Sequence, residues 1–127
     1  MFGNRILSPT TAAEYVGASD TSATTDWTDY TSASTQDSTT GAAATAGLVW
    51  GSVNINNVGG TGAVFLKLRA RTLAADPTTN EIEIPAGTFY KQTLFGLQGG
   101  MPTTISIKKA VAADPTKVIG EFFRSSY

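Results

Sequence analysis

Paired carboxylates are the first groups in this sequence whose type and spacing could do chemistry. Glu81 and Glu83 stand two residues apart, and such a pair can bind calcium or flank a glycosidic bond. Glutamates that alternate with isoleucines, as these do, are more typical of the solvated face of a strand. They are also spaced to pair with Arg69 or Arg71 across a hairpin. We therefore expect neither a catalytic nor a metal-binding role for them.

The composition removes most other catalytic chemistry. The chain contains no histidine and no cysteine, so it lacks the commonest general acid/base, the thiolate nucleophile and the usual transition-metal ligands. Its formal net charge is −1 and only 15% of its residues are charged, which gives no field that would attract nucleic acid or an anionic membrane. We expect no enzyme, no cofactor, no direct nucleic-acid partner and no membrane partner.

The remaining charged residues do not form a recognisable site. Four N-terminal aspartates are spaced too irregularly for a calcium loop of the EF-hand type. They are Asp20, Asp26, Asp29 and Asp37. Lys67, Arg69 and Arg71 form a basic stripe on one expected strand, for which salt bridging is favoured over contact with nucleic acid.

A five-residue motif occurs twice. Ala-Ala-Asp-Pro-Thr spans residues 74–78 and again residues 112–116. Pro presets the φ angle for a turn, and the Asp side chain can accept a backbone N–H two residues further on. The motif is therefore interpreted as a hairpin turn used twice, in preference to a duplicated ligand loop. Residues 59–62, Gly-Gly-Thr-Gly, lack the lysine and helix of a phosphate loop and also predict a turn.

Aromatic side chains are the better candidates for function. Trp50 and Phe65 are expected on strand faces opposite the main apolar set, where an exposed pair would mark an interaction surface. Aromatic residues can stack on sugars, but protein interfaces also bury them, and protein contact is the favoured interpretation. The candidate interface residues are Phe2, Trp27, Tyr30, Trp50, Phe65, Phe123 and Tyr127.

The chain divides into two regions by composition. Residues 1–46 are rich in Ser and Thr and are acidic, whereas residues 47–127 are mildly basic. Composition alone would class residues 19–45 as disordered, but Trp27 and Tyr30 would have little use in a solvated linker. We expect an extended arm over residues 1–46, anchored by aromatic residues on its own body or on a neighbour's, and a folded body over residues 47–127.

Alternation of apolar and polar residues predicts six short strands in the body. They are expected at residues 48–55, 64–73, 81–84, 89–97, 105–108 and 117–124, with one or two more from the arm left open. No window shows a helical apolar stripe. The expected fold is all-β, an antiparallel β-sandwich of jelly-roll-like form with an extended N-terminal arm.

The overall style of the chain resembles the small virion proteins of tailed bacteriophages, especially capsid decoration (cement) proteins. The features that carry the resemblance are the polar arm, the stretches Leu-Val-Trp-Gly-Ser-Val-Asn-Ile at 48–55 and Ile-Pro-Ala-Gly-Thr at 84–88, and a closing strand. The resemblance implies a structural protein of the virion, assembled in the host cytoplasm, often trimeric, that bridges neighbouring copies of the major capsid protein.

Two other functions stay open. One is a glycan- or receptor-binding β-sandwich module of a fibre or tail tip, which would present a concave aromatic and polar site. The other is a different structural subunit of the head or tail. A capsid-bridging protein would present a flat apolar patch instead, together with an arm that leaves its own domain.

Overall fold

The computed structural model describes residues 13–37, 40–68, 81–94 and 101–125. Within them the chain forms eight strands and one short 3₁₀ turn, η2. The strands are β1 (Ala13–Ser22), β2 (Thr28–Tyr30), β3 (Val49–Asn57), β4 (Val64–Lys67), β5 (Ile82–Ile84), β6 (Thr88–Thr93), β7 (Ile105–Lys109) and β8 (Lys117–Ser125), and η2 is Ser32–Ser34. Each of the six strands predicted for the body has its counterpart, from β3 to β8.

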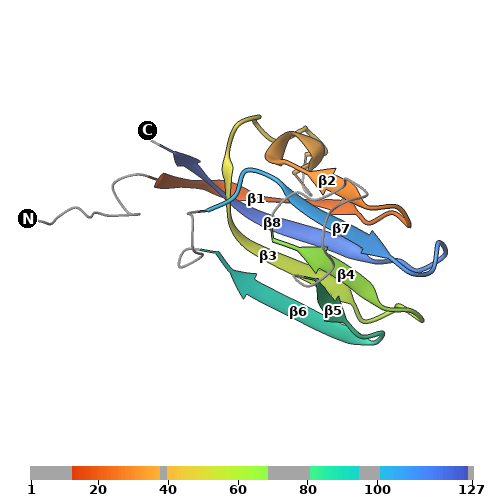
Figure 1. The fold of residues 1–127 in the computed structure, drawn as a ribbon. Helices are drawn as coiled ribbons and strands as arrows, with labels where there is room; N and C mark the ends of the chain where they lie inside the picture. Colours follow the sequence, from red (N-terminus) through yellow and green to blue (C-terminus); the bar gives the residue numbers. More distant parts are fainter. Residues whose placement is uncertain (1–12, 38–39, 69–80, 95–100, 126–127) are drawn as a thin grey trace, which may run out of the picture.

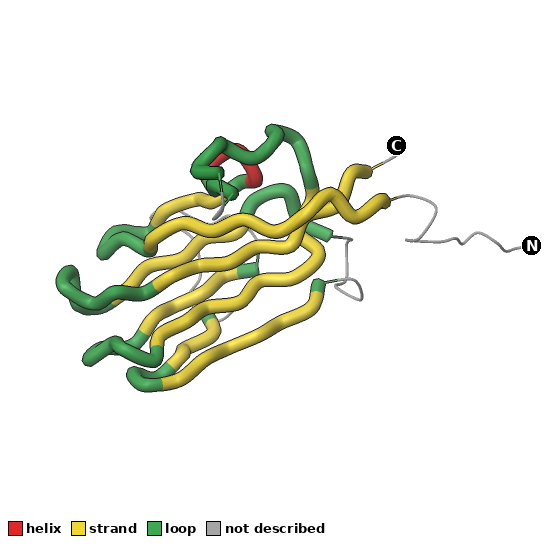
Figure 2. Tube along the Cα trace, turned by 180° about the vertical axis from the view of Figure 1, so that it is seen from behind, coloured by secondary structure: helices red, strands yellow, loops and turns green. Residues whose placement is uncertain are grey.

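Two four-stranded sheets face each other (Figures 1 and 2). One sheet has the order β1-β8-β3-β6 and the other the order β2-β7-β4-β5. Apolar side chains from both sheets fill the space between them, which is the arrangement of a β-sandwich. The predicted all-β, antiparallel sandwich is confirmed.

The strand pairing is nested. β1 pairs with β8, β2 with β7, β3 with β6 and β4 with β5, all antiparallel. The chain therefore forms one long antiparallel ribbon that ends at the β4–β5 pair. The ribbon is rolled up, so that the β1–β8 and β3–β6 pairs lie in one sheet and the β2–β7 and β4–β5 pairs lie in the other. Additional pairs, β3 with β8 and β4 with β7, join the rungs within each sheet. Eight strands wound in this way form a jelly roll.

The N-terminal region supplies a strand to each sheet. β1 runs along β8 from Ala13 to Ser22, and β2 pairs with β7 through residues 28–30. Residues 13–22 and 28–30 thus belong to the sandwich, although they fall within the arm predicted for residues 1–46. Residues 1–12 lie outside the described residues, so an arm there stays a prediction.

The centre of the core is an aromatic pair above a glycine. Trp50 and Phe122 are 0% and 1% exposed, and their ring centroids lie 4.5 Å apart at an interplanar angle of 58°. Gly120 leaves the space that both rings occupy, because a Cβ there would lie 2.6 Å from Cζ of Phe122 and closer still to the Trp50 ring. The indole Nε1 of Trp50 donates to the carbonyl of Tyr30 at 3.2 Å, which ties β2 to this centre.

A bulge turns Trp50 inward. Opposite β8, the register of β3 shifts between Trp50 and Ser52, so Gly51 is the extra residue. Simple alternation from Val53 and Ile55 would place Trp50 on the outer face, but the extra residue returns it to the core face. The prediction that Trp50 is exposed is therefore wrong. Phe65, the other member of that pair, is half-buried and lies between the buried residues Val64 and Leu66 in β4.

Hydroxyl groups secure the segment between β2 and β3. Ser32 and Thr35 are both 0% exposed. Ser32 Oγ donates to the carbonyl of Thr45 at 2.5 Å, Thr35 Oγ1 donates to the carbonyl of Ser32 at 2.7 Å, and the Ser19 and Thr35 hydroxyls lie 2.5 Å apart. Buried hydroxyls need such partners. Ser32 and Thr35 of this segment therefore serve the packing of the fold as bonded, buried hydroxyls.

A Gly120→Ala variant tests the aromatic centre. Because the added methyl would press on two buried rings that have no room to move, we expect it to lower the free energy of unfolding by about 1–3 kcal/mol, the usual effect of overpacking. Urea unfolding followed by circular dichroism measures the change.

Gly51→Ala is the matched control. A Cβ at Gly51 would also meet a ring, that of Phe123, but Phe123 is only half-buried and its ring can swing towards solvent. We expect a smaller loss at Gly51 than at Gly120. An equal or larger loss at Gly51 would show that the Trp50–Phe122 pair does not limit the packing.

Candidate functional site

The outer face of the sheet β2-β7-β4-β5 brings aromatic and charged side chains together in cross-strand rows. In one row, Phe65 of β4 lies opposite Lys108 of β7 and opposite Glu83 of β5. Continuing the β2–β7 register by one residue places Trp27 opposite Lys108 on its other side. This row thus reads Trp27, Lys108, Phe65, Glu83, with aromatic and charged groups alternating.

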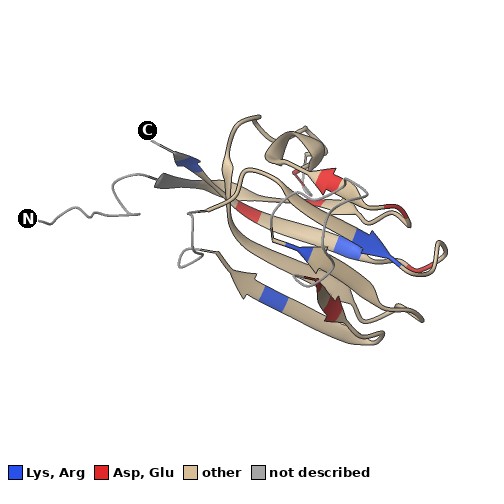
Figure 3. Ribbon diagram, in the orientation of Figure 1, with Lys and Arg blue, Asp and Glu red and all other residues tan. Residues whose placement is uncertain are grey.

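A second row runs beside the first. Ser106 of β7 lies opposite Asp29 of β2 and opposite Lys67 of β4, and its hydroxyl donates to Asp29 Oδ1 at 2.5 Å. Figure 3 shows the basic segments of β4 and β7 next to each other on this sheet. We name the residues Trp27, Asp29, Phe65, Lys67, Ser106 and Lys108 the Trp27 face.

Two ammonium groups lie against one indole. The Nζ atoms of Lys67 and Lys108 lie 4.6 and 4.9 Å from the centroid of the Trp27 ring, and Lys108 Nζ is also 5.4 Å from the Phe65 centroid. Each cation–π contact contributes about 0.5–1 kcal/mol at an exposed site and more where water is excluded. The lysines therefore fix the position of Trp27, although it precedes β2 and has only one strand beside it.

Local sequence explains how this face forms. In β4 and β7 the apolar residues Val64, Leu66, Ile105 and Ile107 are all 0% exposed and point into the core. Their neighbours Phe65, Lys67, Ser106 and Lys108 must then point outward, because successive strand residues face opposite sides. Tyr30 is buried at the end of β2, so the same alternation sends Asp29 and Trp27 outward.

The face is covered unevenly. Lys67 is only 3% exposed and Ser106 is 0% exposed, whereas Trp27, Phe65 and Lys108 are half-buried and Asp29 and Glu83 are exposed. The accessible part is therefore a strip of indole, phenyl and ammonium groups with carboxylates beside it. Such a strip suits contact with a surface that offers apolar atoms and carboxylates.

The other candidate interface residues do not join this face. Tyr30 and Trp50 are 3% and 0% exposed and lie in the core, so their prediction as interface residues is wrong. Phe123 is half-buried on β8 of the other sheet, beside Gly51. Phe2 and Tyr127 lie outside the described residues. Trp27 and Phe65 are the two candidates that the structure brings together.

Sequence reasoning missed Lys108, Asp29 and Ser106 as members of the Trp27 face. Lys108 alternates with Ile105 and Ile107, which is enough to place it on an outer face, but its register against Phe65 and Trp27 depends on strand order. Of the predicted basic stripe, Lys67 lies in this face, and Arg69 and Arg71 lie outside the described residues.

The second copy of the repeated motif forms a clasp between loops. Asp114 lies in the turn between β7 and β8, where its Oδ1 accepts from the Thr61 hydroxyl at 2.8 Å and its Oδ2 accepts from the Gly62 N–H at 2.9 Å. The predicted turn is present. The Asp114 side chain, however, bonds the glycine-rich loop at residues 59–62 and not a backbone N–H of its own turn. The first copy, residues 74–78, lies outside the described residues.

Asn57 completes the clasp. Its side chain is 0% exposed and donates to the carbonyls of Gly62, Ile84 and Pro85 at 3.0–3.4 Å, while its Oδ1 accepts from the Thr116 hydroxyl at 2.9 Å. Three loops at one end of the sandwich therefore converge on it. The hydrogen bonds with Asn57 and Asp114 thus give the glycine-rich loop at residues 59–62 a structural role.

The described residues contain neither a candidate metal site nor a candidate membrane-spanning helix. They contain no group of three or more acidic, histidine or cysteine residues that could hold a metal ion. Glu83 lies opposite Phe65, and its predicted pairing with Arg69 or Arg71 involves residues outside the described part. Within the same ranges, no helix has the length and apolar character needed to cross a membrane.

Comparison with known proteins adds no identification. No protein-family model, curated protein or solved structure matches this chain.

The clasp makes stability depend on pH. The N–H of Gly62 and then that of Thr61 hold the pKa of the Asp114 carboxyl below its ordinary value of 3.8. A carboxyl whose pKa is lower when folded stabilises the protein above that ordinary value, and the contribution is lost as the pH falls through 3.8 towards the folded pKa. We expect Asp114→Asn to be less stable than wild type at pH 7.

Urea unfolding at neutral and acid pH checks this expectation. The stability difference between wild type and Asp114→Asn should shrink as the pH is lowered below 3.8, because the wild-type carboxylate becomes protonated there. A difference that stays constant with pH would mean that the charge of Asp114 contributes nothing.

Proposed function

We propose that this protein is a non-enzymatic structural protein of a virion, which decorates a phage capsid and bridges neighbouring capsid subunits through the Trp27 face. The observation that carries the proposal is the alternating strip of Trp27, Lys108 and Phe65 on the outside of one sheet. Aromatic side chains that stay accessible on a flat sheet are typical of surfaces that bind protein.

The setting in a virion is supported by the resemblance of the sequence to decoration proteins. The jelly roll agrees with it, because viral capsid proteins use this fold, but lectins use the same fold. Fold alone therefore does not choose between them. The chemistry of the Trp27 face favours protein: its rings are flanked by ammonium groups, which suit the carboxylates of a neighbouring subunit.

The mechanism is additive burial. A specific protein contact buries about 1,600 Å² in total, and one sheet face with its adjoining loops can supply a large part of one side. Many copies bound around a shell act together, so that a modest affinity per copy resists rupture. The major capsid protein is the proposed partner, and a homo-oligomer, with a trimer favoured, is the proposed state.

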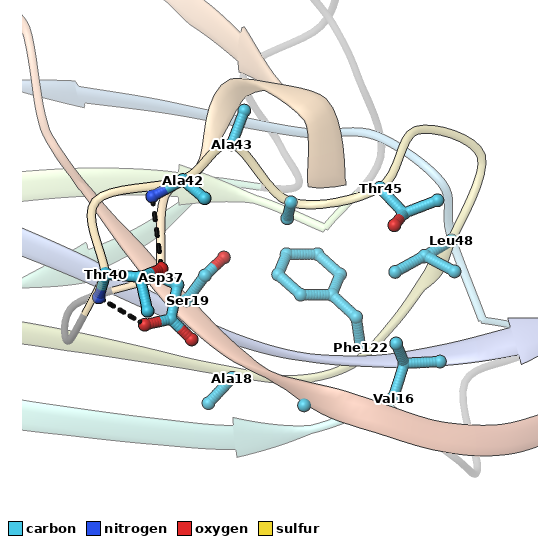
Figure 4. Close-up of a pocket in the computed structure, with 12 residues that line it drawn as sticks. Val16, Ala18, Ser19, Asp37, Thr40, Ala42, Ala43, Thr45, Leu48 and Phe122 are labelled. Atoms are coloured by element: carbon cyan, nitrogen blue, oxygen red, sulfur yellow. Dashed lines mark hydrogen bonds between the residues drawn. The ribbon is translucent and has the colours of Figure 1, made fainter.

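The glycan-binding alternative requires a ring at the surface of a concave site. A pocket of about 300 Å³ lies beside β1 (Figure 4), and the ring in it belongs to Phe122. Phe122 is 1% exposed, so it cannot stack on a sugar. The pocket is otherwise lined by small aliphatic and hydroxyl residues, which favours the capsid-bridging function over glycan binding.

Trp27→Ala tests the proposal. We expect this variant to bind capsids that lack the protein about 30-fold more weakly than wild type, the effect of losing an interface hot spot of about 2 kcal/mol. Co-sedimentation with such particles over a titration gives the apparent dissociation constant. Because Trp27 is only half-buried and lies outside the core, the variant should keep its fold, which circular dichroism verifies.

Phe89→Ala is the matched control. Phe89 is an exposed aromatic residue, at 54%, on β6 of the other sheet, so its loss should leave binding unchanged. If both variants weakened capsid binding equally, or if only Phe89→Ala weakened it, a contact through the Trp27 face would be contradicted. Binding of the wild type to glycans but not to capsids would replace the proposal by the receptor-binding function.

A further inference from the structure

A groove runs along the outer side of β1. Val16, Gly17, Ala18 and Ser19 of β1 form one wall, Asp37, Thr40 and residues 42–45 contribute the other, and Leu48 and Phe122 lie at the floor (Figure 4). Its volume is about 300 Å³, the lower end of the range for binding pockets. Its walls consist largely of glycine, alanine, serine and threonine, so a backbone can approach closely.

The edge of β1 is unpaired in this groove. Asp20 exchanges two backbone hydrogen bonds of 2.8 Å with Gln36, so its peptide groups point away from β8. Ala18, two residues earlier, must point its own N–H and C=O to the same side. Among the described residues these groups have no partner on that side.

The chain that covers Asp20 turns away before it reaches Ala18. Asp37 accepts from the Gly41 N–H at 2.7 Å and donates to the Ala42 carbonyl at 2.8 Å, which reverses the chain directly after the Asp20–Gln36 bridge. The interrupted pairing creates the groove. A short free strand edge beside a small-residue groove is the arrangement to which an extended peptide adds as a further strand.

We infer that this groove receives residues 2–7, Phe-Gly-Asn-Arg-Ile-Leu, of a second copy of the chain as an added strand. This contact deepens the proposed function, on which it rests, by naming a self-association site. Ile6 or Leu7 would place an apolar side chain above Phe122 and Leu48, and Arg5 brings a positive charge to a groove lined by Asp37. Ala18 would exchange backbone hydrogen bonds with the incoming strand.

Chain geometry favours a second copy, and not the same chain, as the source of the strand that enters the groove. β1 is already paired at Ala13, so a fold-back must turn before that residue. A two-residue turn at Thr11-Ala12 lacks the Gly, Asn or Asp that such turns need. The better turn, Ser8-Pro9-Thr10-Thr11 with Pro at its second position, brings Ile6 opposite Ala13, outside the groove. A neighbour's segment can enter in the register that seats Ile6 or Leu7.

Sedimentation equilibrium of the full chain tests the inference. A single added strand buries less than a standard interface, so we expect reversible self-association that depends on concentration. Deleting residues 2–7 should abolish it, and a synthetic peptide of residues 1–8 should dissociate the wild-type oligomer and bind the deletion variant. A wild type that is monomeric at every concentration, or an oligomer that survives the deletion, would overturn the inference.

Ala18→Pro tests the strand edge directly. Proline removes the edge N–H without touching the β1–β8 hydrogen bonds and is tolerated on such an edge, so it should weaken self-association at least tenfold. Phe89→Ala, at an exposed residue of β6 on the opposite edge of the same sheet, is the control and should leave self-association unchanged. Where the proline variant fails to fold, the deletion and the peptide still decide the result.

Two outcomes separate the possible failures. Hydrogen exchange would show fold-back directly: a monomer in which residues 2–7 protect β1 would contradict a second copy as the source. Trp27→Ala should keep full self-association, because Trp27 belongs to the other sheet. Loss of capsid binding with self-association intact, or the reverse, therefore tells whether the proposed function or this inference has failed.

Discussion

The packing of Trp50 against Phe122 above Gly120 is the contact on which the rest of the structure depends. Facing sheets pack about 10 Å apart, and here two large rings fill that gap where β3 and β8 pair. Glycine at 120 makes the gap wide enough, and the bulge at Gly51 aims Trp50 into it. The bond from Trp50 Nε1 to the Tyr30 carbonyl then fixes β2 in the opposite sheet.

The sequence predicted where the strands lie along the chain better than it predicted how they pair with one another. The period-two pattern located the six strands from β3 to β8, because apolar and polar residues alternate along them, and it therefore indicated a sandwich. It misplaced Trp50, because a single extra residue reverses alternation and Gly51 carries no signal that distinguishes a bulge from an ordinary strand glycine. Strand order, and with it the Trp27 face, depends on long-range register, which local pattern does not encode.

The N-terminal third shows a second limit. Its Ser- and Thr-rich composition resembles that of a disordered segment, yet Ser19, Ser32 and Thr35 are buried and bonded. Composition gives the number of hydroxyl groups but does not show which of them have hydrogen-bond partners. A hydroxyl group with such a partner can be buried, whereas burial without one is costly. Because β1 and β2 pair with β8 and β7, this region could be assigned to the fold only once the nested pairing was known.

Nested pairing also explains where the surfaces for contact arise. A jelly roll leaves two open sides, each bounded by one edge strand from either sheet. On one side β5 and β6 lie close together, so the sheets nearly meet. On the other side β1 and β2 are bridged by a segment whose pairing to β1 ends at Gln36. The gap that remains is the groove, while the Trp27 face lies on the outside of the opposite sheet. The aromatic face and the open edge therefore belong to different sheets, and contact at one does not obstruct contact at the other.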